Sequence, residues 1–528
     1  MSRMLRRSAM LSSSLATLLA LSACEKPPAP ATPKATAPAP AKDNTGIAWH
    51  EGDLDDAFAE AREQNKPLLL YWGAVWCPPC NRLKATLFKD PAFIARTRAF
   101  VAVHLDGDLE SAQAWGERFG IKGYPTIIVL APDRSEITRL AGDSDTAHLA
   151  EALRVAANRT SSSAQLLQQA LKEPATLSND DWTILSQYDW SLDGAHLIKS
   201  EHTADVLARL AAAAPQPALQ RRFALLALSM NATDTSPTPK QRATNRALLQ
   251  AVVSDPAEVR ANLSTLTESA HELIQAGAAN ASERATLSNA LTQALDKVYT
   301  DSRLPISDRL ETVYADIALA RLAQGQPADP GPTAPAPPPL PAAVVEKIRQ
   351  RVHWAEQAAH SDAERQSTIS MVADLLDTIG DKAGSEQLLL AELGRSKTPY
   401  YYMPKLAGLA EERGDKQTAL YWLKKTRDSV QSPSLRLNSD TRYVNGLIRL
   451  QPDNAAAIEN ATAQMIAELA HQPDDYLQRH RQRFDTLGKK LKDWSKQHNG
   501  NAVLARLQQK MQQNCSKQER DNCPHWLS

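Results

Sequence analysis

Two cysteines separated by two residues, directly after a short apolar run, constrain this chain more than any other feature. Residues 68–72 read Leu-Leu-Leu-Tyr-Trp, a run typical of a strand buried on both faces. Cys77 and Cys80 follow this run, and a helical pattern continues from them. A sulfur at the start of a helix is stabilised as a thiolate by the helix dipole and by free backbone N–H groups. The pattern therefore predicts Cys77 as a nucleophile and Cys80 as the thiol that closes a disulfide with it.

A zinc half-site is the alternative interpretation of the same spacing, because structural zinc takes four Cys or His ligands. The sequence has no second Cys-x-x-Cys, and the nearest following histidine, His104, falls in a predicted strand. The other cysteines are Cys24, Cys515 and Cys523. We therefore expect a redox pair, with no metal and no cofactor.

Residues 46–158 alternate between helical and strand patterns. Asp53 fits the N-cap position of the first helix, Pro67 ends that helix, and Gly120 closes a later one. The pattern predicts the order αβαβαββα. The expected helices are 54–64, one that begins at the cysteine pair, 109–119 and 146–157, and the expected strands are 68–72, 99–105, 126–130 and 136–140.

A Gly-Tyr-Pro-Thr segment at residues 123–126 precedes the third predicted strand. With Trp76, Cys77 and Cys80, it makes residues 46–158 resemble the thioredoxin fold, in particular the periplasmic thioredoxin-like proteins related to the C-terminal domain of the disulfide reductase DsbD. The resemblance implies an α/β thioredoxin fold and a thiol–disulfide oxidoreductase, with reduction the favoured direction. It also implies client proteins that carry disulfides or thiols, and an upstream electron donor.

The same resemblance implies a substrate groove next to the cysteines. Pro125 is cis in that family and stands against the cysteine pair, and Trp76 belongs to the matching motif. The backbone of Tyr124 can then pair with an extended client segment as a short added strand. We therefore expect Trp76, Tyr124 and Pro125 to shape the groove.

Two departures from the thioredoxin pattern affect the chemistry. Thioredoxin has a buried aspartate six residues before its first cysteine, and Tyr71 occupies that position here. Pro78 and Pro79 lack backbone N–H groups, so Cys77 loses possible donors to its thiolate and its pKa is expected to rise. The direction of electron flow stays open.

The N-terminus has the pattern of an export signal. Three arginines precede an apolar stretch at residues 9–21 that is too short to span a bilayer. The sequence Leu-Ser-Ala-Cys ending at Cys24 resembles the bacterial lipobox, which implies a signal peptide at 1–23, an acylated Cys24 and a place on the periplasmic side of a membrane. Glu25, rather than Asp, favours the outer membrane. An ordinary signal peptide with an incidental cysteine is the alternative, and residues 24–45 form a Pro-rich tether in either case.

The remainder of the chain is predicted to be all helical. A Pro-rich linker or loop at 327–341 divides it into 160–326 and 342–528. In the second part, the Gly-Asp-Lys sequence at 380–382 recurs at 414–416, a 34-residue period typical of tetratricopeptide repeats. A generic helical bundle is the alternative.

Cys515 and Cys523 are separated by seven residues near the C-terminus. We expect them to form a structural disulfide in an oxidising compartment, and a redox pair that exchanges with Cys77 is the alternative.

The charge balance limits the class of partner. The chain carries 60 basic and 60 acidic side chains, so nothing predicts a nucleic-acid partner. The sequence thus favours a membrane-anchored periplasmic oxidoreductase whose helical region recruits client or partner proteins. The alternative is a scaffold or chaperone whose thioredoxin-like part mainly holds clients.

Overall fold

We describe the protein from a computed structural model of the chain. The structure describes residues 46–75, 77–107, 109–141, 146–159, 161–198, 202–230, 237–327, 337–471, 478–516 and 526–527. Several predicted features lie outside these residues: the signal peptide, the predicted lipidation site Cys24, the tether to residue 45, Trp76, most of the Pro-rich linker and Cys523.

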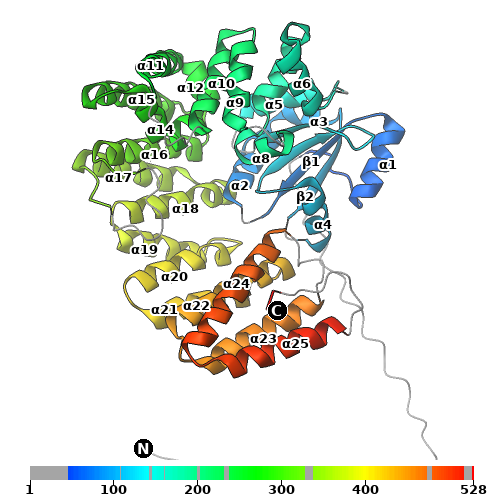
Figure 1. Cartoon of the computed structure of the whole chain (residues 1–528), viewed down its shortest axis with the longest axis vertical. Helices are drawn as coiled ribbons and strands as arrows, with labels where there is room; N and C mark the ends of the chain where they lie inside the picture. The colour runs from blue at the N-terminus through cyan, green and yellow to red at the C-terminus, as the bar shows by residue number, and fades with distance from the viewer. Residues whose placement is uncertain are drawn as a thin grey trace, which may run out of the picture. The chain divides into compact units, whose positions relative to one another are not determined.

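A mixed four-stranded sheet forms the first part of the described chain (Figure 1). Its order is β2-β1-β3-β4, and β1 pairs parallel with β2 and antiparallel with β3. All six residues of β1 are buried, which explains its unbroken apolar sequence. The strands are β1 (Leu68–Gly73), β2 (Val101–Asp106), β3 (Thr126–Leu130) and β4 (Glu136–Ala141).

Helices cover both faces of this sheet because β1 alternates its side chains between them. Leu68 and Leu70 share a core with Leu54 and Phe58 of α1. Tyr71 shares a core with Cys80 of α2 and with the residues around it. The helices are α1 (Leu54–Gln64), α2 (Pro78–Ala85), α3 (Pro91–Thr97), α4 (Glu110–Phe119) and α5 (Thr146–Ala156), with a 3-10 turn at Leu87–Lys89. The predicted order is confirmed, and α3 is an additional helix that the pattern did not separate.

The apolar core under α2 continues into the helices that follow α5. Leu166 of α6 (Ser163–Lys172), Trp182 of α7 (Asn179–Gln187) and Phe223 of α10 (Pro217–Met230) belong to the same core as Tyr71. The edge strand β4 is also covered, since Tyr188 pairs with Leu140 in an antiparallel bridge. We call the helices α6 to α25 the helical array. Its first helices thus complete the core of the sheet.

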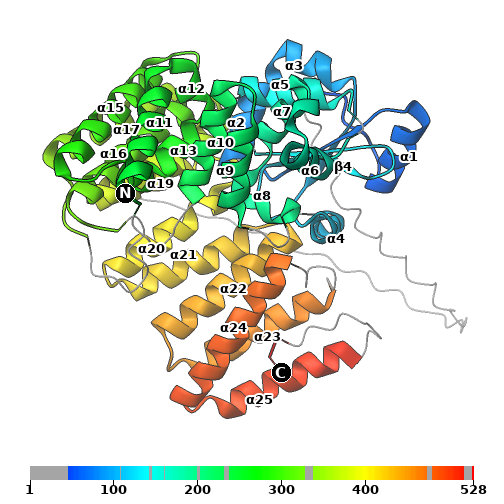
Figure 2. The ribbon, with the colours of Figure 1, turned by 45° about the horizontal axis from the view of Figure 1, so that its top comes forward.

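The rest of the described chain is helical, with no further strand in the described residues, which confirms the expected fold class of an α/β thioredoxin fold followed by an all-α region (Figure 2). No helix within the described ranges combines the length and apolarity that crossing a membrane requires. The remaining helices are α8 (Trp190–Leu197), α9 (Thr203–Ala213), α11 (Pro239–Ser254), α12 (Pro256–Ala261), α13 (Leu263–Glu268), α14 (Ala270–Gly277), α15 (Ala281–Thr300), α16 (Ile306–Ala323), α17 (Ala342–Ala358), α18 (Asp362–Thr378), α19 (Lys382–Leu393), α20 (Met403–Glu412), α21 (Lys416–Ser429), α22 (Pro433–Leu450), α23 (Ala455–His471), α24 (Gln478–Gln497) and α25 (Asn501–Ser516).

The two copies of the Gly-Asp-Lys sequence fold alike. Gly380 and Gly414 both have φ +82°, the left-handed conformation that glycine adopts at low cost. Asp381 then caps α19 and Asp415 caps α21, each by accepting a backbone N–H three residues on. The local repeat is therefore structural, and its assignment to the tetratricopeptide class stays a prediction.

Candidate active site

The cysteine pair lies where β1 leads into α2. Cys77 is the N-cap residue of α2, and its Sγ accepts the backbone N–H of Cys80 at 3.2 Å. Pro78 and Pro79 occupy the first two helical positions and offer no N–H group. The two sulfurs are joined in a disulfide, with the Cα atoms 5.2 Å apart. The geometry agrees with the spacing argument made from the sequence.

Both cysteines are covered by protein. Cys77 is 2% exposed and Cys80 is 0% exposed, whereas Val75, two residues before Cys77, is 44% exposed. The exposure of the two cysteines thus differs little in this oxidised form. The assignment of Cys77 as the attacking thiol rests on its place at the helix start and stays a prediction.

The Tyr124–Pro125 peptide bond is cis, as the resemblance implies. Pro125 directly precedes β3, whose first residue, Thr126, pairs with Trp72 near the end of β1. The cysteine loop also follows the C-terminal end of β1. Pro125 and the cysteine pair therefore lie at the same end of the two neighbouring strands β1 and β3.

Glycine at position 107 leaves room for the side chain of Tyr124. Tyr124 donates its hydroxyl hydrogen to the backbone oxygen of Gly107 at 3.3 Å, and Gly107 donates its N–H to Gly73 at 2.8 Å. A Cβ atom on Gly107 would lie 2.4 Å from the Tyr124 ring, which no real contact permits. The close approach holds the predicted groove residue against the ends of β1 and β2.

Tyr71 replaces the buried acid of thioredoxin, and the structure places His104 beside it. The two residues are in register on β1 and β2, and their ring centroids are 5.0 Å apart. Burial, and to a lesser extent the nearby Lys84, lowers the pKa of His104 to about 4, so the imidazole is neutral at physiological pH. This part of the core therefore holds a phenol and a neutral imidazole. Sequence reasoning treated His104 only as a zinc candidate, and the register of the two strands was the signal it missed.

Helix α2, which begins at the cysteine pair, is anchored to the helical array by a buried ion pair. Arg82 of α2 donates through Nη1 to Oδ1 of Asp308 in α16 at 2.9 Å, and both side chains are less than 9% exposed. Ser307 also donates to the same carboxylate oxygen, at 3.1 Å. Helix α2 packs against α18 as well. The array therefore contacts the helix that carries the cysteines.

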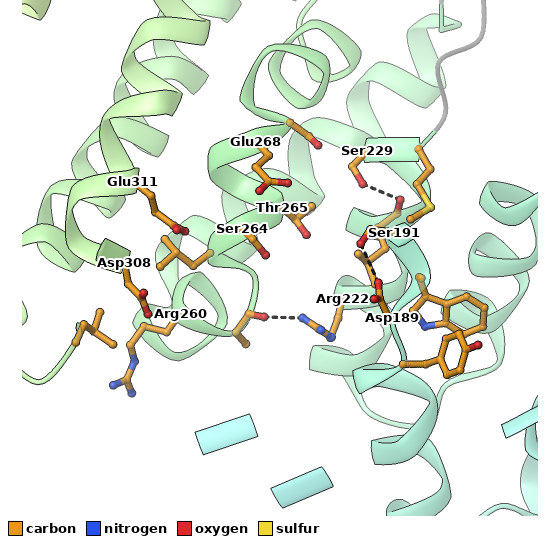
Figure 3. Close-up of a pocket in the computed structure, with 18 of the residues that line it drawn as sticks. Asp189, Ser191, Arg222, Ser229, Arg260, Ser264, Thr265, Glu268, Asp308 and Glu311 are labelled. Carbon is orange, nitrogen blue, oxygen red and sulfur yellow. Dashed lines mark hydrogen bonds between the residues drawn. The ribbon is translucent and has the colours of Figure 1, made fainter. Parts of the chain in front are cut away.

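A mixed-charge pocket adjoins this ion pair (Figure 3). Its labelled groups come from several helices, and many serve internal contacts. Arg222 donates to the backbone oxygen of Ala261, and Ser191 donates to Asp189 at 3.0 Å. We interpret the pocket as a junction between α2 and the array.

Among the other sequence-predicted positions, Trp76 and Cys24 lie outside the described residues, so their roles stay predictions. Cys515 falls in α25, and its predicted partner Cys523 lies outside the described ranges, so that disulfide stays a prediction. Within the described ranges, no group of three or more His, Cys, Asp or Glu side chains is arranged to hold a metal ion.

The sheet order, the disulfide at the start of α2 and the cis proline before β3 define a thioredoxin-type redox site. Residues 48–132 match the sequence model of a family described as thioredoxin-like. The chain is 31% identical to thioredoxin H4 of Arabidopsis thaliana over 91 residues, which are 17% of this chain and 73% of that protein. The chain belongs to the thioredoxin-like family.

Two bacterial relatives match the same part of the chain. It is 38% identical over 110 residues to thiol:disulfide interchange protein DsbD 1 of Pseudomonas aeruginosa, covering 20% of this chain and 19% of that protein. It is 28% identical over 110 residues to thioredoxin-related protein DsbJ of Chlamydia pneumoniae, covering 19% of this chain and 31% of that protein. The chain thus spans less than a third of the length of either. No solved structure matches the chain significantly.

Proposed function

We propose that this protein is a thiol–disulfide oxidoreductase in which Cys77 attacks and Cys80 resolves. The observation that carries the proposal is the Cys77–Cys80 disulfide at the N-terminus of α2. One relative is named a thiol:disulfide interchange protein, and this name supports the same reaction class.

In the reducing direction, the reaction begins with both cysteines as thiols. The Cys77 thiolate attacks one sulfur of a client disulfide, which forms a mixed disulfide and releases the other client sulfur as a thiolate. The Cys80 thiolate then attacks the sulfur of Cys77 and releases the second client thiol. The client gains two electrons, the Cys77–Cys80 disulfide forms, and a dithiol donor protein must reduce it again. The reverse sequence oxidises a client.

The proposed setting is the periplasmic side of a bacterial membrane. The arginine-rich start, the apolar stretch and the lipobox-like sequence ending at Cys24 support export and acylation. The Pro-rich tether would hold the folded part away from the bilayer. The outer membrane is the favoured location, and the helical region is the proposed recruiting surface.

A trapping experiment tests the reaction. Cys80→Ala removes the resolving thiol, so mixed disulfides on Cys77 should accumulate in cells. They should appear as high-mass bands on a non-reducing gel and disappear when a reductant is added. Cys77→Ala is the matched control, and it should give no such bands. If the two variants trap the same proteins in the same yield, the assigned roles are wrong.

The burial of both sulfurs favours a second candidate, a scaffold or chaperone that holds clients without redox turnover. In that case Cys80→Ala should trap no mixed disulfides, while noncovalent complexes with clients persist in both cysteine variants.

A further inference from the structure

A polar pocket of about 470 Å³ lies between α22 and α24 in the last part of the array. Its volume falls in the range of ordinary ligand pockets. Guanidinium, amide and hydroxyl groups line it, and no carboxylate does among the described residues. The lining residues are Asn438, Thr441, Arg442 and Asn445 from α22 and Gln482, Arg483 and Thr486 from α24. This composition suits an anion.

Arg442 lies in the middle of α22 and differs from Arg449, which lies near the end of the same helix. Arg449 is paired with Glu411 through two hydrogen bonds. Arg442 has no carboxylate within ion-pair distance in the part of the chain that the structure describes, although its side chain is exposed to solvent. Neighbouring protein displaces part of the water around the guanidinium, and this desolvation lowers the pKa of Arg442. A negatively charged ligand would supply the compensation that the fold does not.

A second group in the pocket lacks a partner. Asn445 donates its Nδ2 hydrogen to the backbone oxygen of Thr441 at 2.8 Å, and this fixes the orientation of the amide. Its Oδ1 is then buried with no donor among the described residues. An amide N–H that reaches this oxygen would satisfy it. The pocket thus offers one charged donor, Arg442, and one unpaired acceptor, Oδ1 of Asn445, to a ligand.

A peptide can satisfy both groups, because a single residue can carry a carboxylate for Arg442 and a backbone amide N–H for Oδ1 of Asn445. We propose that this pocket holds a carboxylate presented by an extended peptide segment of a partner protein. Arg481, adjacent to the pocket residue Gln482, forms an ion pair with Glu117 of α4 at 3.7 Å. Helix α24, which lines the pocket, therefore also contacts the thioredoxin-like part of the chain. The inference rests on the proposed recruiting role of the helical region and gives that role a chemistry.

Peptide binding to the full-length oxidised protein tests the proposal. The probes are fluorescein-labelled octapeptides of glycine, serine and alanine, without cysteine. One has a free C-terminal carboxylate, one has a C-terminal amide, and one has the amide plus a single internal glutamate. Fluorescence anisotropy measures the dissociation constant of each. Inorganic phosphate serves as a competing free anion.

The expected result is that the wild-type protein binds at least one carboxylate-bearing peptide at least about tenfold more tightly than the neutral amide, the order of one charge-assisted hydrogen bond. Arg442→Gln should abolish that preference, and Arg442→Lys should retain part of it. Lys490→Gln, on an exposed position of α24 outside the pocket, removes the same charge and should change binding less than about twofold. The free acid and the internal glutamate show which carboxylate is preferred.

Three results would overturn the proposal. They are equal or undetectable binding of all three peptides, equal effects of Arg442→Gln and Lys490→Gln, and phosphate binding as tight as that of the best peptide, which would indicate a free-anion site. Because the probes lack cysteine and the protein is oxidised, failure here leaves the thiol chemistry untouched. Conversely, failure of the trapping experiment leaves these binding constants unchanged.

Discussion

Replacing Asp308 with asparagine should destabilise the protein and change the chemistry of a disulfide that lies 228 positions earlier in the sequence. Asp308 is the buried partner of Arg82, and the two side chains are 7% and 8% exposed. Asp308→Asn keeps the size of the side chain and removes its charge. The guanidinium then stays buried without its carboxylate, which costs about 3–5 kcal/mol of stability. Replacing both partners, with Arg82→Met and Asp308→Leu, should restore most of that loss.

The same change removes one negative charge from the contact with Arg82, so the surroundings of the helix that carries the cysteines become more positive by one unit charge. Arg82 follows Cys77 by five residues, about 7.5 Å along the helix axis. At about 10 Å and an effective dielectric constant of about 20, a unit charge stabilises a fully formed Cys77 thiolate by about 1.7 kcal/mol. Reduction then becomes more favourable, and the reduction potential should rise by about 35 mV. In the double replacement the net charge is unchanged, so the potential should return close to the wild-type value.

Denaturant unfolding gives the stability, and glutathione redox buffers with alkylation give the potential. Glu151→Gln is the control, because Glu151 and Arg154 form an ion pair whose side chains are about half exposed. Breaking that pair should cost no more than about 1 kcal/mol and leave the potential unchanged. A loss below about 1 kcal/mol for Asp308→Asn, or a potential shared by all three variants, would refute the coupling between the array and the redox helix.

Three further predictions concern single residues. Cys77 should be alkylated before Cys80 in the reduced protein at mildly acidic pH, and faster labelling of Cys80 by mass spectrometry would reverse their roles. Cys24→Ser should release the protein from the membrane fraction, and an unchanged fraction without acyl mass on Cys24 would contradict lipidation. The pKa of His104 is about 4 in the folded protein, against an ordinary value of 6.5, so the unfolded chain binds the proton first and stability falls as pH drops from about 6.5 to 4. His104→Phe should remove up to about 3 kcal/mol of that fall in unfolding measurements across this window, and an unchanged pH dependence would show that His104 does not cause it.

Local patterns predicted the redox part of the fold well. The first helix and the third strand have the expected bounds, Leu54–Gln64 and Thr126–Leu130, because an N-cap and a proline mark the helix and an apolar run marks the strand. The helix at Pro91–Thr97 escaped notice, since its seven residues show little periodicity. The cis peptide bond before Pro125 was predicted from the resemblance to the family motif.

Contacts between distant residues could not be read from the sequence. The pairing of Tyr188 with Leu140 covers the edge of the sheet from a segment that shows no strand pattern of its own. The Arg82–Asp308 pair joins residues 226 positions apart, and nothing local to either residue indicates the other. Burial of both cysteines likewise depends on how the chain packs around α2.

The most direct test of the central claim is whether the Cys77–Cys80 disulfide exchanges electrons in the native protein. The full-length protein is equilibrated with glutathione buffers of increasing reducing strength, quenched with acid and alkylated. Mass spectrometry then measures the fraction of the Cys77–Cys80 peptide that carries the alkyl label. The account predicts a reversible two-electron transition under native conditions, with the fold retained on both sides of it. A disulfide that stays closed until the protein unfolds would contradict the account, because the pair would then be a structural crosslink.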